Sequence, residues 1–160
     1  MADSKKPWGG RFQKATAESV DRFTSSIQFD QRLYPYDIEG SIAHATMLAR
    51  KNIISKSESL KIVSALKAIL KDIEQGKFQF KSGDEDIHMA VEKELIRRIG
   101  DTGGKLHTAR SRNDQVVLDV RLFLRAEIKI IIDAIRSLQA TLIGLATKEI
   151  KIIMPGYTHM

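Results

Sequence analysis

Apolar residues recur at every third or fourth position along most of the chain, which is the pattern of amphipathic helices. The alternation typical of strands covers only residues 77–81, KFQFK, so this segment is at most a short extended piece. The chain is therefore predicted to be all-α. The expected helices span about residues 16–26, 37–51, 55–76 and 87–99, followed by a much longer helix from about 116 to 153.

Local signals mark the ends of two of these helices. Ser55 and Glu58 have the spacing of a capping box, in which each side chain accepts a backbone N–H that the helix leaves free. Acidic residues at 84–86 favour the positive end of the helix that follows them. Gly76 and Gly100 are suited to end the third and fourth helices, because glycine takes up the conformation of a helix C-terminus at little cost.

The last predicted helix is unusual in its length and in its apolar surface. At 1.5 Å per residue it extends on the order of 55–60 Å. Apolar residues repeat every seven positions along it, and further apolar side chains point to other sides: Val117, Leu124, Ile131, Leu138 and Leu145, with Phe123, Ile130, Ile132 and Ile143. A helix that is apolar on most sides must be covered by other parts of a protein. We therefore expect missing downstream helices, neighbouring subunits or both to enclose it.

These elements predict a small helical domain followed by one helix of a larger bundle. Residues 1–112 are expected to form an N-terminal helical domain with an irregular arm, and the loop at 100–112 is its boundary. Residues 113–160 are expected to hold the first long helix of a central helix bundle and the start of the next loop. The bundle is incomplete, so we expect the chain to be the truncated N-terminal part of a larger protein.

Composition narrows the classes of function. With 42% hydrophobic and 29% charged residues, the chain has the balance of a soluble globular protein. It has no cysteine, which fits a reducing compartment, and the cytoplasm is the default expectation. We expect no signal peptide and no membrane span, because charged residues at 129, 133 and 136 interrupt the most apolar stretch. The net charge of +6 comes from lysines scattered among acidic residues, so no nucleic-acid partner is expected.

The loop before the long helix, residues 105–115 with the sequence KLHTARSRNDQ, concentrates groups that bind carboxylates. Arg110 and Arg112 offer planar forks of N–H donors, and Asn113 lies where a helix N-terminus favours anions. In the simpler alternative, one arginine pairs with Asp101, Asp114 or Asp119 and Asn113 only caps the helix.

A second polar segment, MPGYTHM at residues 154–160, follows the long helix. Its Pro-Gly turn is expected to direct Tyr157, Thr158 and His159 away from the helix. A histidine suits proton transfer near neutral pH, although an exposed loop histidine explains the residue equally simply. The four histidines lack metal-binding spacing and have no thiol beside them, so no metal site is expected.

Four segments, in this order along the chain, together resemble the argininosuccinate lyases of the fumarase/aspartase superfamily, to which the delta-crystallins are related. They are WGGRF at 8–12, EDIH at 85–88, GKLHTARSRNDQVV at 104–117 and PGYTH at 155–159. The resemblance implies cofactor-free β-elimination of argininosuccinate to arginine and fumarate, as in arginine biosynthesis, by a homotetramer whose active sites each draw on three subunits.

The resemblance also implies roles for individual residues. It implies that Arg112 and Asn113 bind the succinyl carboxylates, and that Thr158 and His159 face them from another subunit, with His159 in proton transfer. Ser26, Asp86 and His88 match residues that line the same pocket. By residue type alone, Ser26 would simply terminate a helix, Asp86 would cap a helix and His88 would pack in the core.

The family's catalytic serine loop lies further downstream and is not in this sequence, so we expect residues 1–160 alone to be inactive and to self-associate. Three alternatives stay open. Adenylosuccinate lyase, fumarase and aspartase share the chemistry but differ in the loop at 108–115. A delta-crystallin-like protein would keep the fold without catalysis, and a helical partner-binding module would explain the long helix but not the polar loop.

Overall fold

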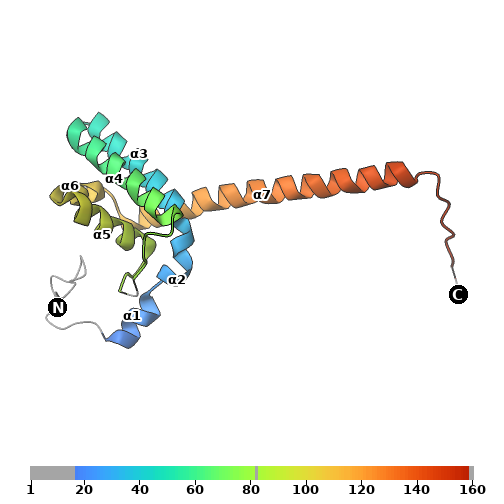
Figure 1. Cartoon of the computed structure of the whole chain (residues 1–160), viewed down its shortest axis with the longest axis horizontal. Coiled ribbons are helices and arrows are strands. Elements are labelled where there is room, and N and C mark those ends of the chain that lie inside the picture. The colour runs from blue at the N-terminus through green and yellow to red at the C-terminus, as the bar shows by residue number, and fades with distance from the viewer. Residues whose placement is uncertain (1–16, 82, 159–160) are drawn as a thin grey trace. The chain divides into compact units, whose positions relative to one another are not determined.

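The computed structural model describes residues 17–81 and 83–158. Every regular element in these two ranges is a helix, as the apolar periodicity predicts (Figure 1). The chain divides into two compact units, Met1–Asp119 and Val120–Met160, which we call the first and second unit. The predicted arm at 1–16, which holds the WGGRF motif, and His159 lie outside the described residues.

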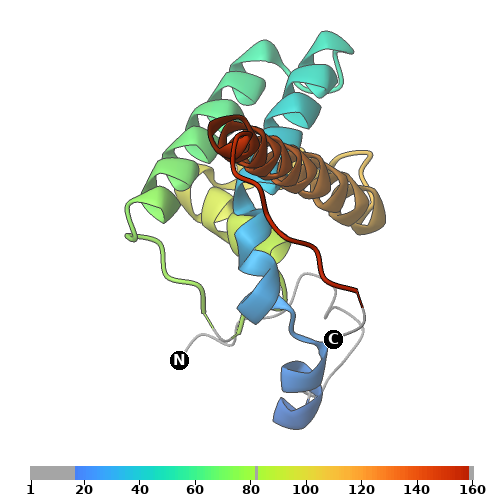
Figure 2. The same ribbon diagram turned by 90° about the vertical axis from the view of Figure 1, so that its right-hand side faces the viewer.

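Helices α3, α4 and α5 form the body of the first unit and pack against one another (Figure 2). Short helices precede and follow them. In chain order the elements are α1 (Glu18–Thr24), α2 (Ile27–Asp30), η2 (Gln31–Leu33), α3 (Tyr34–Arg50), α4 (Lys56–Glu74), α5 (Ile87–Ile99), α6 (Asp101–Gly104), η3 (Lys105–His107) and the beginning of α7 (Arg112–Glu149).

The core of the first unit consists mostly of apolar side chains from the three longer helices. The largest fully buried ones are Ile38, Leu48, Ile62, Leu66, Ile69, Ile87, Met89 and Leu95. Each of them contributes on the order of 1.5–3 kcal/mol through removal of apolar surface from water. This core holds α3 and α5 in fixed positions, and both helices contribute side chains to the polar cluster described below.

The predicted helix ends of α4 and α5 are confirmed. Ser55 Oγ accepts the Glu58 N–H at 3.1 Å, and the Glu58 carboxylate accepts the Ser55 N–H at 2.8 Å, which completes the capping box. The carboxylate of Asp86 caps α5 by accepting the Met89 N–H at 2.6 Å. Gly76 and Gly100 follow the two helices with φ of +66° and +61°, a conformation that favours glycine.

Several boundaries differ from the prediction. The helix predicted at 16–26 is shorter, because α1 ends at Thr24, and a further short helix, α2, begins at Ile27 beyond the predicted range. Helix α3 begins three residues earlier than predicted, with Pro35 in its first turn, where no backbone N–H is needed. The loop predicted at 100–112 contains α6 and η3.

Helix α7 begins at Arg112, so Asn113 is its second residue and not its cap. The Ser111 hydroxyl takes the capping role instead and accepts the Asn113 N–H at 3.2 Å. The Asp114 carboxylate in turn accepts the Ser111 N–H at 3.3 Å. The prediction placed the cap two residues too late, because serine and asparagine both suit this position.

The second unit consists of the rest of α7 and a segment without regular structure at 152–158. None of the side chains from 120 to 149 is buried within the chain, and Leu124, Ile131 and Leu138 expose 48%, 56% and 59% of their surface. By length and composition, α7 also qualifies as a membrane-spanning helix, a property that it shares with core helices of soluble proteins.

Candidate functional site

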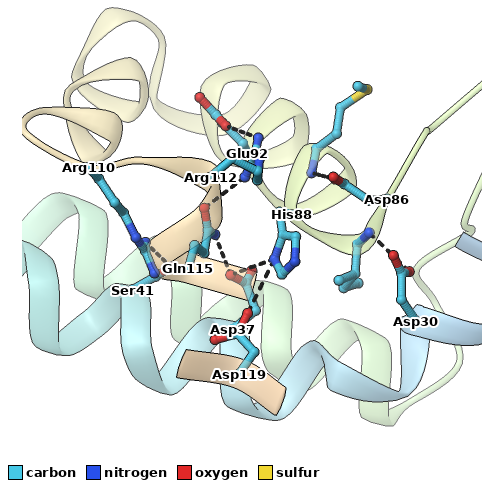
Figure 3. Close-up of polar contacts among 12 residues, drawn as sticks. Asp30, Asp37, Ser41, Asp86, His88, Glu92, Arg110, Arg112, Gln115 and Asp119 are labelled. Carbon is cyan, nitrogen blue, oxygen red and sulfur yellow. Dashed lines mark hydrogen bonds and ion pairs between the residues drawn. The ribbon is translucent and has the colours of Figure 1, made fainter. Parts of the chain in front are cut away.

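Polar side chains from α3, α5 and the start of α7 meet inside the first unit (Figure 3). On each helix they are spaced three or four residues apart, which places them on one face. We call this group the polar cluster. Its members are Asp37 and Ser41 from α3, His88 and Glu92 from α5, Arg112, Gln115 and Asp119 from α7, and Arg110 from the preceding loop.

A histidine between two carboxylates forms the centre of the polar cluster. His88 Nδ1 lies 3.2 Å from Asp37 Oδ1, to which its N–H donates, and 3.3 Å from Asp119 Oδ2, within ion-pair distance. His88 is 3% exposed, and the two aspartates are fully buried. Asp37 Oδ2 and both carboxylate oxygens of Asp119 are buried without a hydrogen bond of ordinary geometry among the described residues. An added proton would therefore be favourable here.

The environment raises two pKa values in this centre. Burial raises the pKa of Asp119 to about 7, and the negative charge of Asp37 adds to this effect. Burial alone lowers the pKa of His88, but the hydrogen bond to Asp37 and the charges of the neighbouring aspartates raise it overall. Near neutral pH, the centre therefore holds more protons than the same residues hold in water.

The contacts of His88 also explain a grouping that resembles a metal site. Asp37, His88 and Asp119 carry ligand atoms of the type that binds cations, all within 4.8 Å of one another. The imidazole N–H already donates to Asp37, and the charge of Arg110 acts on both aspartates. The contacts of His88 and the positive charge of Arg110 therefore account for the close approach of the two aspartates.

The two arginines predicted to bind carboxylates lie at the edge of the polar cluster and are paired within the chain. Arg112 Nη2 lies 3.0 Å from Glu92 Oε2, and Arg112 Nη1 donates to Gln115 Oε1 at 2.8 Å. Arg110 Nη1 donates to Ser41 Oγ at 2.9 Å. The ion-pair partner of Arg112 is thus a glutamate on α5, and not one of the three aspartates considered from the sequence.

The space within the polar cluster is small. It has a volume of about 10 Å³, which is enough for one water molecule. No dicarboxylic acid fits into this space. A ligand of Arg112 must therefore approach from the outer side of the guanidinium, whose side chain is 28% exposed.

The structure also brings Ser26 to the start of α5. The Ser26 N–H donates to the Glu85 carbonyl at 2.7 Å, and the Ser26 hydroxyl donates to Asp30 Oδ2 at 2.5 Å. Asp30 Oδ1 accepts the Ile87 N–H at 3.2 Å. Ser26 and Asp86 therefore border the same helix N-terminus, whose first turn contains the buried His88.

The remaining predicted site residues lie outside the polar cluster. Asn113 is exposed in the first turn of α7, next to Arg112. Thr158 is exposed and belongs to the second unit, and His159 follows it outside the described residues. The roles of these three residues in binding and catalysis stay predictions.

Sequence reasoning missed Asp37, Glu92 and Gln115, and it considered Asp119 only as a partner for an arginine. The available signal was positional, because residues 112, 115 and 119 share one face of α7. The pattern of apolar residues identifies apolar core positions but not polar residues that face the core. No sequence pattern indicates that position 37 lies next to positions 88 and 119.

Known proteins similar to this chain cover it almost completely. The sequence model of a family described as "Lyase" matches residues 10–160. Curated relatives named argininosuccinate lyase include one from Syntrophus aciditrophicus, 63% identical over 158 residues, which are 99% of this chain and 34% of that protein. Others come from Alkaliphilus metalliredigens, 58% identical over 97% of this chain, and Staphylococcus haemolyticus, 53% identical over 98%. The chain spans 34% of the length of each of these relatives.

Proposed function

Because the chain belongs to the lyase family, whose sequence model matches residues 10–160, we propose that it forms part of an argininosuccinate lyase. The observation that carries this proposal is the 63% identity, over 158 residues, to a relative named for that activity. The proposed reaction splits argininosuccinate into arginine and fumarate, in the cytoplasm and as a step of arginine biosynthesis.

The proposed chemistry explains why the site is rich in arginine. A base removes a proton from the carbon next to a carboxylate, the electron pair forms the carbon-carbon double bond, and the carbon-nitrogen bond breaks. The leaving guanidinium nitrogen takes up a proton. Negative charge accumulates on the substrate carboxylate in the transition state, so cations and N–H donors aimed at it lower the barrier.

We assign carboxylate binding to Arg112 and Asn113. The geometry of α7 supports this assignment, because its N-terminus places both residues where the helix dipole favours an anion. Arg112 has five N–H donors and uses two nitrogens within the chain, so donors are left for a ligand. Ser26, Asp86 and His88 are proposed to form the wall of the same pocket.

The complete site needs more than one copy of the chain. We propose that Thr158 and His159 of another subunit face the bound carboxylates, that His159 transfers a proton, and that neither a metal nor an organic cofactor takes part. The exposed apolar surface of α7 supports assembly into a homotetramer, because apolar surface of this extent is normally covered.

An arginine-to-lysine exchange in the full-length protein tests this proposal. Arg112→Lys keeps the positive charge but loses the planar fork that binds a carboxylate with two parallel hydrogen bonds. Fumarate formation, followed by its ultraviolet absorbance, is expected to fall about 100-fold or more in kcat/KM, the loss typical of removing one donor to developing charge.

Arg97→Lys is the matched control, because Arg97 lies on the surface of α5 with 71% of its side chain exposed. It should leave fumarate formation unchanged. Absence of fumarate formation by the unsubstituted full-length protein would overturn the proposed activity, and unchanged activity of Arg112→Lys would overturn the role of Arg112.

A further inference from the structure

A single amide side chain connects the proposed carboxylate ligand to the buried centre. Gln115 is 5% exposed and lies one turn after Arg112 on the same face of α7. Its Oε1 accepts a hydrogen bond from Arg112 Nη1 at 2.8 Å, and its Nε2 donates to Asp37 Oδ1. Asp37 Oδ1 also faces the Nδ1–H of His88 at 3.2 Å.

The orientation of this amide is fixed by its two neighbours. In the opposite orientation, the NH₂ group would face the guanidinium of Arg112 and the carbonyl oxygen would face the carboxylate of Asp37. Both contacts would then be repulsive, because a donor would face a donor and an acceptor an acceptor. A glutamine is thus suited to this position because it accepts at one end and donates at the other.

The guanidinium of Arg112 is consequently held at two of its nitrogens. Gln115 accepts from Nη1, and Glu92 Oε2 lies 3.0 Å from Nη2. These contacts define the plane of the guanidinium, because the group is rigid and its donors point in fixed directions. Since Gln115 and Asp37 are buried, the support for this plane comes from the core of the first unit.

We infer that Gln115 is a positioning residue, which orients the Arg112 guanidinium for a dicarboxylic substrate and anchors it, through Asp37, to His88. The inference rests on the proposed function. A group displaced by about 1 Å loses much of its effect on binding and rate, so an orienting contact of this kind matters without touching the substrate.

The experiment uses the full-length protein and compares two substitutions. Gln115→Met keeps the length of the side chain but removes both hydrogen bonds. We expect kcat/KM for argininosuccinate to fall about tenfold or more, and the inhibition constant of the dicarboxylate succinate to rise by a similar factor; a tenfold change corresponds to about 1.4 kcal/mol. Gln75→Met is the control, because Gln75 is exposed at the end of α4.

A double-mutant cycle separates positioning from a general loss of structure. If Gln115 acts through the fork of Arg112, Gln115→Met should change succinate inhibition in the Arg112 background and have little further effect in the Arg112→Lys background. Equal effects in both backgrounds would overturn the inference. So would a change in the unsubstituted background no larger than that of Gln75→Met.

Gln115→Glu gives an independent readout if the methionine variant does not fold. Ionised, the new carboxylate faces Asp37 and repels it; protonated, it has the same donor and acceptor pattern as glutamine. The other titratable groups around position 115 are Asp37, His88, Glu92, His107, Arg110, Arg112 and Asp119, and they are shared with the unsubstituted protein.

The activity of Gln115→Glu, relative to the unsubstituted protein at each pH, should therefore recover as the pH falls. A ratio that does not depend on pH would contradict the inference. These outcomes presuppose an unsubstituted protein that forms fumarate, so a failure of the proposed function is recognised separately by the absence of that activity.

Discussion

Asp37, His88 and Asp119 are buried side by side, and His88 and Asp119 bind a proton there more tightly than they would in water. His88 Nδ1 lies 3.2 Å from Asp37 Oδ1 and 3.3 Å from Asp119 Oδ2, and neither aspartate is exposed to water that could screen its charge. Two buried negative charges next to one imidazole are costly unless a proton or a further cation balances them. The polar cluster therefore links the stability of the first unit to pH.

The raised pKa of Asp119 determines whether the free energy of unfolding rises or falls with pH. Burial, followed by the charge of Asp37, raises the pKa of Asp119 from 3.8 to about 7 in the folded chain. Between these values the folded state holds a proton that the unfolded state has released. The contribution of Asp119 to the free energy of unfolding is therefore fully present below about pH 4 and decreases as the pH rises to about 7. The raised pKa of His88 acts in the same direction above its unfolded value.

We therefore predict that Asp119→Asn flattens the pH dependence of unfolding between about pH 4 and pH 7, because the neutral amide has no proton to lose. Urea unfolding of the 160-residue chain, followed by circular dichroism, measures this. Asp101→Asn, at an exposed position, is the control and should keep the unsubstituted slope. Glu58 and Glu94 do not obscure the result. Their pKa values are lowered from 4.5 to about 2, so they change the free energy of unfolding with pH only below about pH 4.5. Equal slopes for Asp119→Asn and the unsubstituted chain would contradict the prediction.

At the scale of secondary structure, the close approach of α6 to α5 depends on one glycine. A Cβ atom on Gly103 would lie 2.9 Å from the Cα of Ile96 and 3.0 Å from its backbone nitrogen. Backbone atoms cannot move aside as a flexible side chain would. Because α6 continues into η3 and then into the loop that carries Arg110, this contact also determines where that loop begins.

We predict that Gly103→Ala lowers the free energy of unfolding by about 1–3 kcal/mol, the usual cost of overpacking. Gly104→Ala is a close control, because a Cβ there meets nothing within 4 Å. That variant should be neutral or stabilised by up to about 1 kcal/mol, since alanine reduces the freedom of the unfolded chain. Urea unfolding of both variants gives the comparison, and equal stabilities would show that the contact between α5 and α6 tolerates a side chain.

The longer helices were predictable from sequence because each combines a regular apolar stripe with a recognisable end, as Ser55 and Gly76 show for α4. Helix α6 was not, because its four residues, DTGG, include two glycines and resemble a loop. In the candidate site, Arg112 stood out by its side-chain chemistry. Its partners Glu92 and Gln115 did not, because nothing marks them among the other polar residues until folding brings α5 and α7 together.

At the scale of the whole molecule, α7 carries more apolar surface than the chain itself covers. The side chains at its seven-residue repeat, Leu124, Ile131 and Leu138, each expose about half of their surface or more. At about 25 cal/mol per Å² of apolar area removed from water, pairing such helices contributes several kcal/mol. Nothing in the described part of the chain offsets this tendency to associate.

We therefore predict that the 160-residue chain self-associates through α7. Sedimentation velocity over a wide concentration range should show dimers or larger species, and the double substitution Ile131→Glu/Leu138→Glu should shift the population toward monomer, because two buried carboxylates are costly at an apolar interface. Gln139→Glu adds one such charge at a neighbouring exposed position and should change the distribution less than Leu138→Glu alone. A chain that stays monomeric at every concentration would contradict both this prediction and the proposed bundle. Association depends on where the apolar residues of α7 lie as well as on how many there are. A seven-residue repeat keeps their side chains along one face of the helix, where a second helix can cover all of them.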